Sequence, residues 1–286
     1  MVIPTYNRAA MIKRAITSVL TQDHEDLEVI VVDDLSRDNT EEVVRGIKDP
    51  RVKYIRRPEN KGAGAARNTG IRESRGGYIA FLDSDDEFLP GKLRAQVRMF
   101  EDLSLKPGLV FANIWENEAK KKSSVPGKTP SGYVEIGKKF PASVYCGPPT
   151  WMLTRECIGK VGFFDEILWT LEDLDYFARA VRDCPVYFIN QPLVLKHTHA
   201  CKKGSVPDRY AQRTGERILE KWYGEMKKDK RFLVNFYCMM GKDMMRSKKK
   251  EKAVEYLRKA FEADPFNAKV LWKLGRAVMS GRGGNR

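Results

Sequence analysis

The sequence has no long apolar run and no regular pattern of cysteines. Short apolar stretches such as 29–32 suit strands and are far shorter than the roughly 20 residues that a transmembrane helix needs. The five cysteines are an odd number without CxxC spacing, which predicts reduced thiols and neither a disulfide framework nor a zinc site. The chain does not open with a basic segment followed by an apolar region, so we expect no secretion signal and a cytoplasmic location.

Charge is unevenly distributed along the 286 residues. Lysine and arginine outnumber the acids by 52 to 38, which gives a formal net charge of +14. Residues 206–286 carry 21 basic and 10 acidic side chains, whereas residues 1–205 carry 31 and 28. We therefore predict a nearly neutral globular domain over 1–205 and a basic module over 206–286. A solvated lysine-rich helical surface, an anionic membrane surface or a nucleic acid would each account for the basic excess.

Strand and helix patterns alternate in the N-terminal part of the chain. Apolar, β-branched runs predict strands in 1–7, 27–32, 52–55 and 78–82, and helical spacing predicts helices in 8–22, near 36–42 and in 65–73. This alternation is typical of an α/β fold in which helices cover both faces of a parallel sheet. Right-handed crossovers place the strand ends on one edge of such a sheet, which is where these folds bind ligands.

The rest of the chain changes character twice. Residues 116–142 are rich in turn formers without periodicity, which predicts an exposed loop, and strands at 150–153, 186–189 and 193–195 with a helix at 172–181 follow. After residue 205 the pattern is helical, beginning with a helix over about 209–227. Residues 234–267 follow the 34-residue tetratricopeptide spacing, and a partial repeat follows them. The positions that carry this spacing are Tyr237, Met240, Gly241, Ala253, Leu257, Ala260, Pro265, Leu271, Leu274 and Gly275.

Carboxylates follow two of the predicted strands. Asp83-Ser84-Asp85 comes directly after an apolar run, and oxygen ligands held at a strand end suit Mg²⁺ or Mn²⁺ that also binds a diphosphate. An exposed acidic turn is the alternative explanation. Asp33-Asp34 ends another strand on the same predicted edge, where a carboxylate can accept from a base N–H or a ribose hydroxyl. The alternative for this pair is capping of the next helix.

Other candidates are weaker signals by themselves. Tyr6 offers a ring for base stacking, and residues 61–68 form a small-residue turn in which Arg67 suits a phosphate or a sugar hydroxyl. Glu172-Asp173 begins a helix, where acids are favoured by the helix dipole and where one of them can also serve as a general base. His197 and His199 follow a late strand. Either could be a metal ligand near the predicted edge, and a structural role is the alternative.

Taken together, these motifs resemble those of family 2 glycosyltransferases. The matching segments occur in the family's order at 3–8, 32–36 with 39–40, 60–62 with 65–68, 81–86, 162–166 and 172–173. The resemblance implies a GT-A fold with a Rossmann-like mixed sheet flanked by helices, a UDP- or GDP-sugar donor, a divalent cation (Mn²⁺ or Mg²⁺) and inversion at the anomeric carbon. Leu35 stands where the family commonly has glycine. The QxxRW sequence of processive, membrane-embedded synthases is absent, which suggests transfer of a single sugar.

The resemblance also assigns roles to individual residues. The nucleotide-sugar would be bound by Pro4, Tyr6, Arg8, Asp33, Asp34, Arg67, Asn68, Asp83 and Ser84, with Tyr6 and Asp34 at the base. The metal would be held by Asp85, Asp83 and His199, with His197 as the second choice of histidine. Asp173 would be the catalytic base, and the acceptor site would include Thr150, Trp151 and Glu172.

These roles predict an inverting, metal-dependent transfer of a hexosyl or N-acetylhexosaminyl group to a glycan, a glycolipid or a polysaccharide precursor. Two alternatives stay open. One is sugar transfer to a polyprenyl phosphate, with the basic region held at the anionic inner surface of a membrane. The other is a catalytically silent scaffold that recruits a protein partner through its helical repeat. Nucleic-acid binding is not favoured, because the sequence contains no recognisable nucleic-acid-binding motif.

Overall fold

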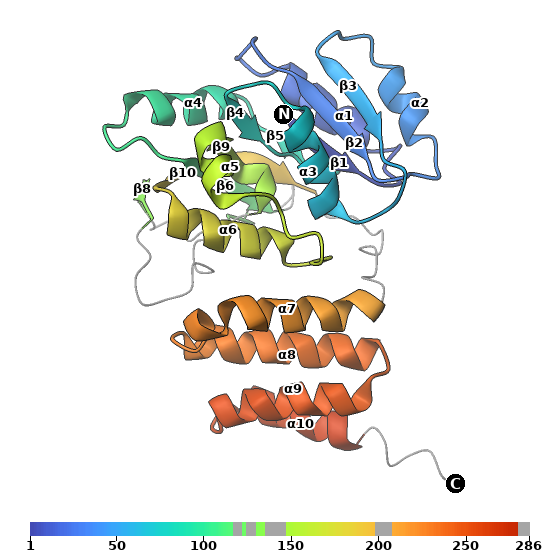
Figure 1. Ribbon diagram of the computed structural model, residues 1–286, viewed down its shortest axis with the longest axis vertical. Coiled ribbons are helices and arrows are strands. Elements are labelled where there is room, and N and C mark those ends of the chain that lie inside the picture. Colours follow the sequence, from blue (N-terminus) through green and yellow to red (C-terminus); the bar gives the residue numbers. More distant parts are fainter. Residues whose placement is uncertain (117–121, 124–129, 135–146, 198–207, 280–286) are drawn as a thin grey trace. The chain divides into compact units, whose positions relative to one another are not determined.

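The computed structural model describes residues 1–116, 122–123, 130–134, 147–197 and 208–279, which form two compact units (Figure 1). The first unit contains the described residues up to 197 except Ile167–Leu171. The second unit contains Ile167–Leu171 and the described residues from 208 onward. A short segment before the helix at 172 therefore groups with the helical unit, which the sequence does not indicate.

The N-terminal half of the first unit contains a parallel sheet of three of the four predicted strands; the fourth, at 78–82, lies in the mixed sheet and pairs antiparallel there. Strands β1 (Val2–Thr5), β2 (Val29–Asp33) and β3 (Val52–Arg56) pair in parallel in this order. Every residue of β1 and β2 is buried, because parallel strands are covered on both faces. The connections run through the helices α1 (Ile12–Leu20) and α2 (Thr40–Arg45).

The second half of the first unit is a mixed sheet. Its strands are β4 (Tyr78–Ala80), β9 (Trp151–Thr154), β6 (Leu109–Glu116), β10 (Val186–Lys196) and β5 (Glu87–Phe88), in this spatial order. Only β6 and β10 run parallel to each other. A parallel bridge between Val2 and Phe81 places the end of β4 beside β1. The mixed sheet confirms the predicted α/β class.

Several elements of this half differ from the local predictions. Helices α4 (Lys92–Asp102) and α5 (Arg155–Val161) were not predicted, nor were β5 and β6. The predicted loop at 116–142 contains the short strands β7 (Lys122–Ser123) and β8 (Gly132–Tyr133), so a wholly irregular loop is wrong. The two predicted late strands are one strand, β10, whose register shifts around Pro192 because proline has no N–H to donate.

Helix α3 (Ala63–Glu73) packs closely against β1 and β2. A β-carbon at Gly70 would overlap the side chain of Val2, so glycine permits this approach. The close packing buries Arg67 and Asn68 on the same helix. Both polar side chains therefore need partners inside the protein.

The described residues from 208 onward are helical apart from short turns, which confirms the predicted helical C-terminal region. Its long helices are α7 (Asp208–Met226), α8 (Lys230–Arg246), α9 (Lys250–Ala263) and α10 (Ala268–Met279), coloured orange to red in Figure 1. Small residues lie where neighbouring helices meet: a β-carbon at Gly215 would overlap Met240, and one at Gly241 would lie 2.7 Å from Cγ of Leu257. The tetratricopeptide relationship stays a prediction.

Candidate active site

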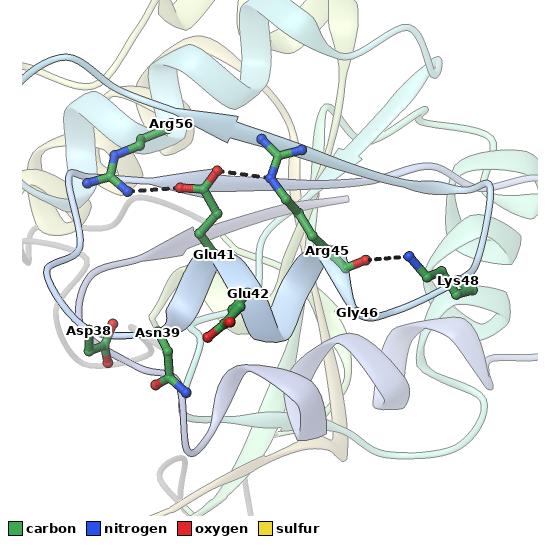
Figure 2. Close-up of a pocket in the computed structure, with 8 residues that line it drawn as sticks. All are labelled: Asp38, Asn39, Glu41, Glu42, Arg45, Gly46, Lys48 and Arg56. Atoms are coloured by element: carbon green, nitrogen blue, oxygen red, sulfur yellow. Dashed lines mark hydrogen bonds and ion pairs between the residues drawn. The ribbon is translucent and has the colours of Figure 1, made fainter.

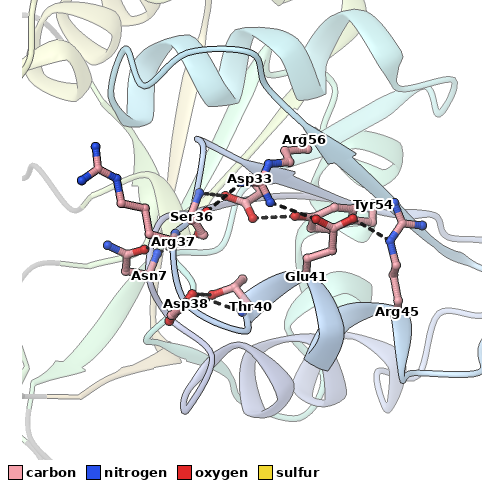
Figure 3. A network of polar contacts seen from close by, with 10 residues as sticks. All are labelled: Asn7, Asp33, Ser36, Arg37, Asp38, Thr40, Glu41, Arg45, Tyr54 and Arg56. Carbon is pink, nitrogen blue, oxygen red and sulfur yellow. Dashed lines mark hydrogen bonds and ion pairs between the residues drawn. The ribbon is translucent and has the colours of Figure 1, made fainter.

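The loops that follow β1 and β2 are joined by side-chain hydrogen bonds (Figure 3). Buried Asp33 accepts from the Ser36 N–H at 2.7 Å and from the Tyr54 hydroxyl at 2.5 Å. Asn7 joins this turn, since its N–H donates to Ser36 Oγ and its side-chain oxygen accepts from the Arg37 N–H, both at 2.8 Å. Each oxygen of Asp33 thus accepts one hydrogen bond from within the protein, and these bonds order the turn.

The same two loops hold non-glycine residues in the left-handed backbone region. Leu35 has φ of 70° and Asn7 has φ of 52°. Leucine at position 35 thus keeps a conformation that glycine adopts freely, at a cost of roughly 1–2 kcal/mol. Such conformations persist where the surrounding structure enforces them, and they concentrate at functional sites. Pro4 is buried within β1, the strand that leads into the first of these loops.

The residues predicted for the base lie at the ends of β1 and β2. Tyr6 is 40% exposed, so it is accessible to a stacking base. Buried Asp34 accepts from the Gly62 N–H at 2.7 Å and the Lys61 N–H at 3.2 Å, and it forms an ion pair with Arg57. Burial raises the pKa of Asp34, although these donors and Arg57 act in the opposite direction. Arg57, which directly follows β3, is not among the residues predicted from the sequence.

Arg67 joins the acidic turn after β4 to the start of α6 (Glu172–Asp183). Its side chain is 4% exposed, with Nη2 donating to Asp83 at 2.8 Å and Nη1 donating to Glu172 at 2.9 Å. Burial lowers the pKa of Arg67, but the carboxylates of Asp83, Glu172 and Asp173 outweigh it and raise the pKa, so the guanidinium stays charged. Its buried Nε–H has no hydrogen-bond partner among the described residues.

Glu172 and Asp173 have different environments in the first turn of α6. Glu172 is buried, and burial followed by the charge of Asp173 raises the pKa of Glu172 to about 7, against the effect of Arg67. Asp173 is partly exposed, and its Oδ1 accepts from the Leu174 N–H at 2.8 Å. Among the described residues, Asp173 is therefore the more accessible carboxylate of this pair.

The raised pKa of Glu172 predicts a pH dependence of stability. Because the folded pKa of about 7 exceeds the unfolded value of 4.5, the folded chain binds more protons between these pH values, and stability falls as pH rises through this window. Glu172→Gln keeps an acceptor for Arg67 and removes the ionisation. Urea titrations from pH 4.5 to 7.5 should show a smaller decline in the free energy of unfolding for the variant than for the wild type. If the free energy of unfolding falls equally with pH in the variant and the wild type, the raised pKa of Glu172 is contradicted.

The turn after β4 gathers three carboxylates. Asp83 and Asp85 are partly exposed, and Asp85 lies 3.8 Å from Nε of Arg8. Asp86 is buried, and burial followed by the charges of Asp83 and Asp85 raises the pKa of Asp86 to about 8. Ser84, between the first two acids, is buried. The turn is therefore strongly electronegative, with one arginine beside each partly exposed acid.

Of the two predicted histidines, only one lies within the described residues. His197 follows β10, its N–H donates to Asp86 at 3.2 Å, and its Nε2 lies 2.8 Å from a carboxylate oxygen of Glu87. The end of β10 thus reaches the acidic turn. His199 falls in 198–207, outside the described residues, so its predicted role as a metal ligand stays a prediction.

The donor set of the acidic turn fits a divalent cation shared with a diphosphate. Within the described ranges, no group of three or more His, Cys, Asp or Glu side chains is arranged around a metal position. Mg²⁺, however, is commonly bound through one or two carboxylates together with substrate phosphates. Asp83 and Asp85 supply that pair, and the repulsion that raises the pKa of Asp86 is what a bound cation would relieve.

Three further predicted site residues, Asn68, Thr150 and Trp151, are also buried. The Asn68 amide donates to the Phe164 carbonyl at 3.0 Å and accepts from the Phe164 N–H at 2.9 Å, so it fixes the turn before α6. Thr150 and Trp151 are completely buried, and the Trp151 ring stacks on Phe177 with centroids 5.6 Å apart. Because their side chains have no exposed surface, we do not include Thr150 and Trp151 in a proposed acceptor site.

A separate open depression of about 550 Å³ lies over α2 (Figure 2). Glu41 spans it, accepting from Arg45 and Arg56, each at 2.9 Å, and Lys48 donates to the Arg45 carbonyl at 3.2 Å. Glu41 is thus already paired with both arginines of the depression. The described residues that line it include none of the predicted nucleotide-sugar residues, so we do not assign the active site here.

Comparisons with known proteins identify the family of this chain. Residues 1–162 match the family described as glycosyl transferase family 2. The chain belongs to this family. An uncharacterized glycosyltransferase of Rickettsia prowazekii is 29% identical over 236 residues, which are 80% of this chain and 71% of the relative. The chain spans only 34% of the length of similar uncharacterized glycosyltransferases from Rickettsia felis and Rickettsia conorii.

A further relative has a more specific name. The GalNAc(5)-diNAcBac-PP-undecaprenol beta-1,3-glucosyltransferase of Campylobacter jejuni is 35% identical over 143 residues, which are 49% of this chain and 45% of that protein. Because the match covers under half of either chain, it supports family membership and leaves the substrate of this family 2 chain to proposal.

Solved structures confirm the predicted GT-A fold. Staphylococcus aureus TarS 1-349 in complex with UDP-GlcNAc has a TM-score of 0.73 and 17% identity, and the match covers 97% of this chain and 86% of TarS 1-349. Mannosyltransferase PcManGT from Pyrobaculum calidifontis in complex with GDP-Man and Mn²⁺ has a TM-score of 0.59 and 17% identity, with 98% and 80% covered. Among the helices in the described part of this family 2 chain, none combines the length and apolar character that crossing a bilayer requires.

Proposed function

We propose that this chain transfers one hexosyl or N-acetylhexosaminyl group from a nucleotide-diphosphate sugar to an acceptor hydroxyl, with a divalent cation and with inversion. The observation that carries the proposal is the bridge from Asp83 through buried Arg67 to Glu172. The bridge brings Asp83 close to the helix turn that carries Asp173, which supports the proposal. Single-displacement transfer requires these two groups around one anomeric carbon.

The donor is expected to lie along the edge formed by the ends of β1, β2 and β4. Tyr6, which is partly exposed, offers its ring to the base. Asp34 accepts from Lys61, Gly62 and Arg57, which leaves about one of the roughly four acceptor positions of a carboxylate for a base or ribose donor. Arg8, beside Asp85, is a cation available to the diphosphate. Neighbours of similar fold in complex with UDP-GlcNAc and GDP-Man support a donor of this class.

In this mechanism Asp173 takes the proton from the acceptor hydroxyl. The acceptor oxygen then forms a bond to the anomeric carbon on the face opposite the diphosphate, and the bond to the diphosphate oxygen breaks with its electron pair. A divalent cation held by Asp83 and Asp85 would neutralise charge on the leaving diphosphate. Arg67 keeps Glu172 and Asp83 in place, so the base and the acidic turn stay aligned.

The proposal is tested with the full chain, Mn²⁺ and a panel of UDP-, GDP-, CMP- and dTDP-sugars. We expect one nucleotide class to raise the melting temperature and its sugar to be hydrolysed slowly or transferred, with release of the nucleoside diphosphate. No shift and no release with any donor would contradict the proposal, and would favour the silent scaffold. The same assay with a polyprenyl-phosphate acceptor tests the second candidate function, sugar transfer to a polyprenyl phosphate. The Campylobacter jejuni relative, whose name includes undecaprenol, supports this candidate.

Asp85→Asn tests the proposed cation site. The amide is a weaker ligand than a carboxylate for a hard cation, so we expect Mn²⁺-dependent affinity for the nucleoside diphosphate to fall about tenfold. Isothermal titration calorimetry with and without EDTA measures this change. Asp102→Asn, at the exposed end of α4, is the matched control and should leave the Mn²⁺-dependent affinity for the nucleoside diphosphate unchanged. Equal affinity of Asp85→Asn and wild type would remove Asp85 from the site.

A further inference from the structure

Polar side chains at the end of α1 hold the chain segment that follows the acidic turn. The hydroxyl oxygen of Ser18 accepts from the Phe88 N–H at 3.0 Å. One helical turn later, Gln22 donates to the Leu89 carbonyl at 3.1 Å and accepts from the Leu93 N–H at 3.2 Å. These bonds all go to the backbone of the segment, so they fix where it lies relative to α1.

Arg14, one helical turn before these residues on α1, bonds to the acidic turn itself (83–86). Its Nη2 donates to the Asp85 carbonyl at 2.8 Å, and its Nε lies 2.9 Å from Oε1 of Glu87. The same oxygen of Glu87 lies 2.8 Å from Nε2 of His197 at the end of β10. A guanidinium can make both contacts at once because its N–H groups form a rigid fork. Arg14 therefore connects the turn to α1 and, through Glu87, to β10.

The bond from Arg14 reaches the backbone of Asp85 and not its side chain. It uses none of the carboxylate oxygens that a cation would need, whereas Nε of Arg8 lies 3.8 Å from one of them. Because the carbonyl of Asp85 is held, its carboxylate has fewer positions to adopt, so less entropy is lost when a cation binds. Groups that hold a metal ligand in place typically change metal affinity about 10–100-fold when they are removed.

We propose that Arg14 is a positioning residue, which holds the Asp85 carbonyl so that the carboxylate of the same residue meets a divalent cation. Asp85 is a cation ligand only in the proposed function, on which this role of Arg14 rests. Arg14 itself contacts neither the cation nor the sugar donor, because its guanidinium is engaged by the Asp85 carbonyl and by Glu87. Ser18 and Gln22 assist by holding the segment that follows.

Arg94 provides a matched control on the same interface. Its Nη2 donates to the Asp23 carbonyl at 2.9 Å and its Nε lies 3.0 Å from an Asp23 carboxylate oxygen, which repeats the contacts of Arg14 at the other end of α1. The side chains of Arg14 and Arg94 are 39% and 55% exposed, so each ion pair contributes little to stability. Arg14→Met and Arg94→Met remove the same kind of contact, and only the first removes a bond to Asp85.

Hydrogen exchange of the full chain without ligands tests whether Arg14 holds the turn. The Asp86 N–H donates to the Asp83 carbonyl at 3.1 Å within the turn. Arg14→Met should make the amides of 84–88 exchange about threefold faster or more, because the turn opens more often without its link to α1. Arg94→Met should leave these amides unchanged, and both variants should melt within about 3 °C of the wild type.

Calorimetry with UDP and with GDP, each in Mn²⁺ or in EDTA, tests the effect on the cation site. Arg14→Met should lower the Mn²⁺-dependent affinity about tenfold and leave the affinity in EDTA unchanged. Arg14→Lys should lie between this variant and the wild type, because an ammonium keeps the charge but lacks the fork. Arg94→Met should bind like the wild type in both conditions.

Three results would overturn the proposal. The first is exchange at 84–88 that is equal in Arg14→Met and the wild type. The second is faster exchange without any loss of Mn²⁺-dependent affinity, and the third is an equal loss of that affinity in Arg94→Met. A wild type that binds neither nucleotide would contradict the proposed sugar transfer. The exchange result would then decide by itself whether Arg14 positions Asp85.

Discussion

Asp173→Asn is expected to lower kcat for sugar transfer by about 10²–10⁴-fold and to leave donor affinity within about twofold. Asparagine has nearly the same shape but cannot take the proton of the acceptor hydroxyl. Asp173 is the more accessible carboxylate of its pair, because Glu172 is buried against Arg67. Its Oδ1 caps the Leu174 N–H, a role that asparagine retains, so the fold should be unaffected.

The measurement is transfer or donor hydrolysis in steady state, with donor affinity from calorimetry. Asp183→Asn is the matched control, because it makes the same change at the other end of α6 and should leave kcat unchanged. A variant at Asp173 that retains wild-type turnover would exclude the base role. Loss of donor affinity together with kcat would instead indicate that Asp173 contributes to binding.

Arg67→Met is expected to lower the free energy of unfolding by about 3–5 kcal/mol. The substitution removes the charge that compensates Glu172, whose side chain is only 10% exposed, and the hydrogen bond to Asp83. Methionine retains the apolar bulk of the side chain. The decrease in the free energy of unfolding is therefore caused mainly by the Glu172 carboxylate that is left without a cation. Protonation of Glu172 can absorb part of the loss, so the effect should be larger at pH 8 than at pH 6, on either side of the pKa of about 7.

Urea denaturation at both pH values measures this effect. Adding Glu172→Gln to Arg67→Met removes the buried charge and should recover part of the stability, which a simple packing defect would not. Arg45→Met on α2 is the control, since its ion pair with Glu41 is largely exposed and should contribute little. If the single Arg67 variant does not fold, folding of the double variant is itself the expected result, and failure of both would contradict the charge account.

The sequence predicted the parallel half of the sheet because those elements carry strong local patterns. Residues 29–32 are a continuous apolar run, and the acids at 33–34 follow directly. The mixed half was less predictable. β6 pairs with β10, whose residues lie more than 70 positions further along the chain, and local periodicity does not report such pairing.

The same limit applies to the individual site residues. Asp83 and Glu172 come from separate segments, and only the packing of α3 against β1 places Arg67 between them. Trp151 carries no local sign of its complete burial, because an aromatic residue suits both a core and a sugar site. For Asp33, the sequence indicated a polar residue at a strand end. The hydroxyl that donates a hydrogen bond to Asp33 belongs to Tyr54 on another strand, β3, and this contact depends on how the strands pair.

The sequence by itself determined the family, the α/β class and the set of acids and arginines available for chemistry, because these depend on residue identity and short spacings. Tertiary structure decided which of these residues meet. It paired Arg67 with two acids and left Asp173 partly exposed. The reason is physical: burial, the shift of a pKa and the closing of a charge pair all depend on atoms that are close in space, whatever their separation in the chain.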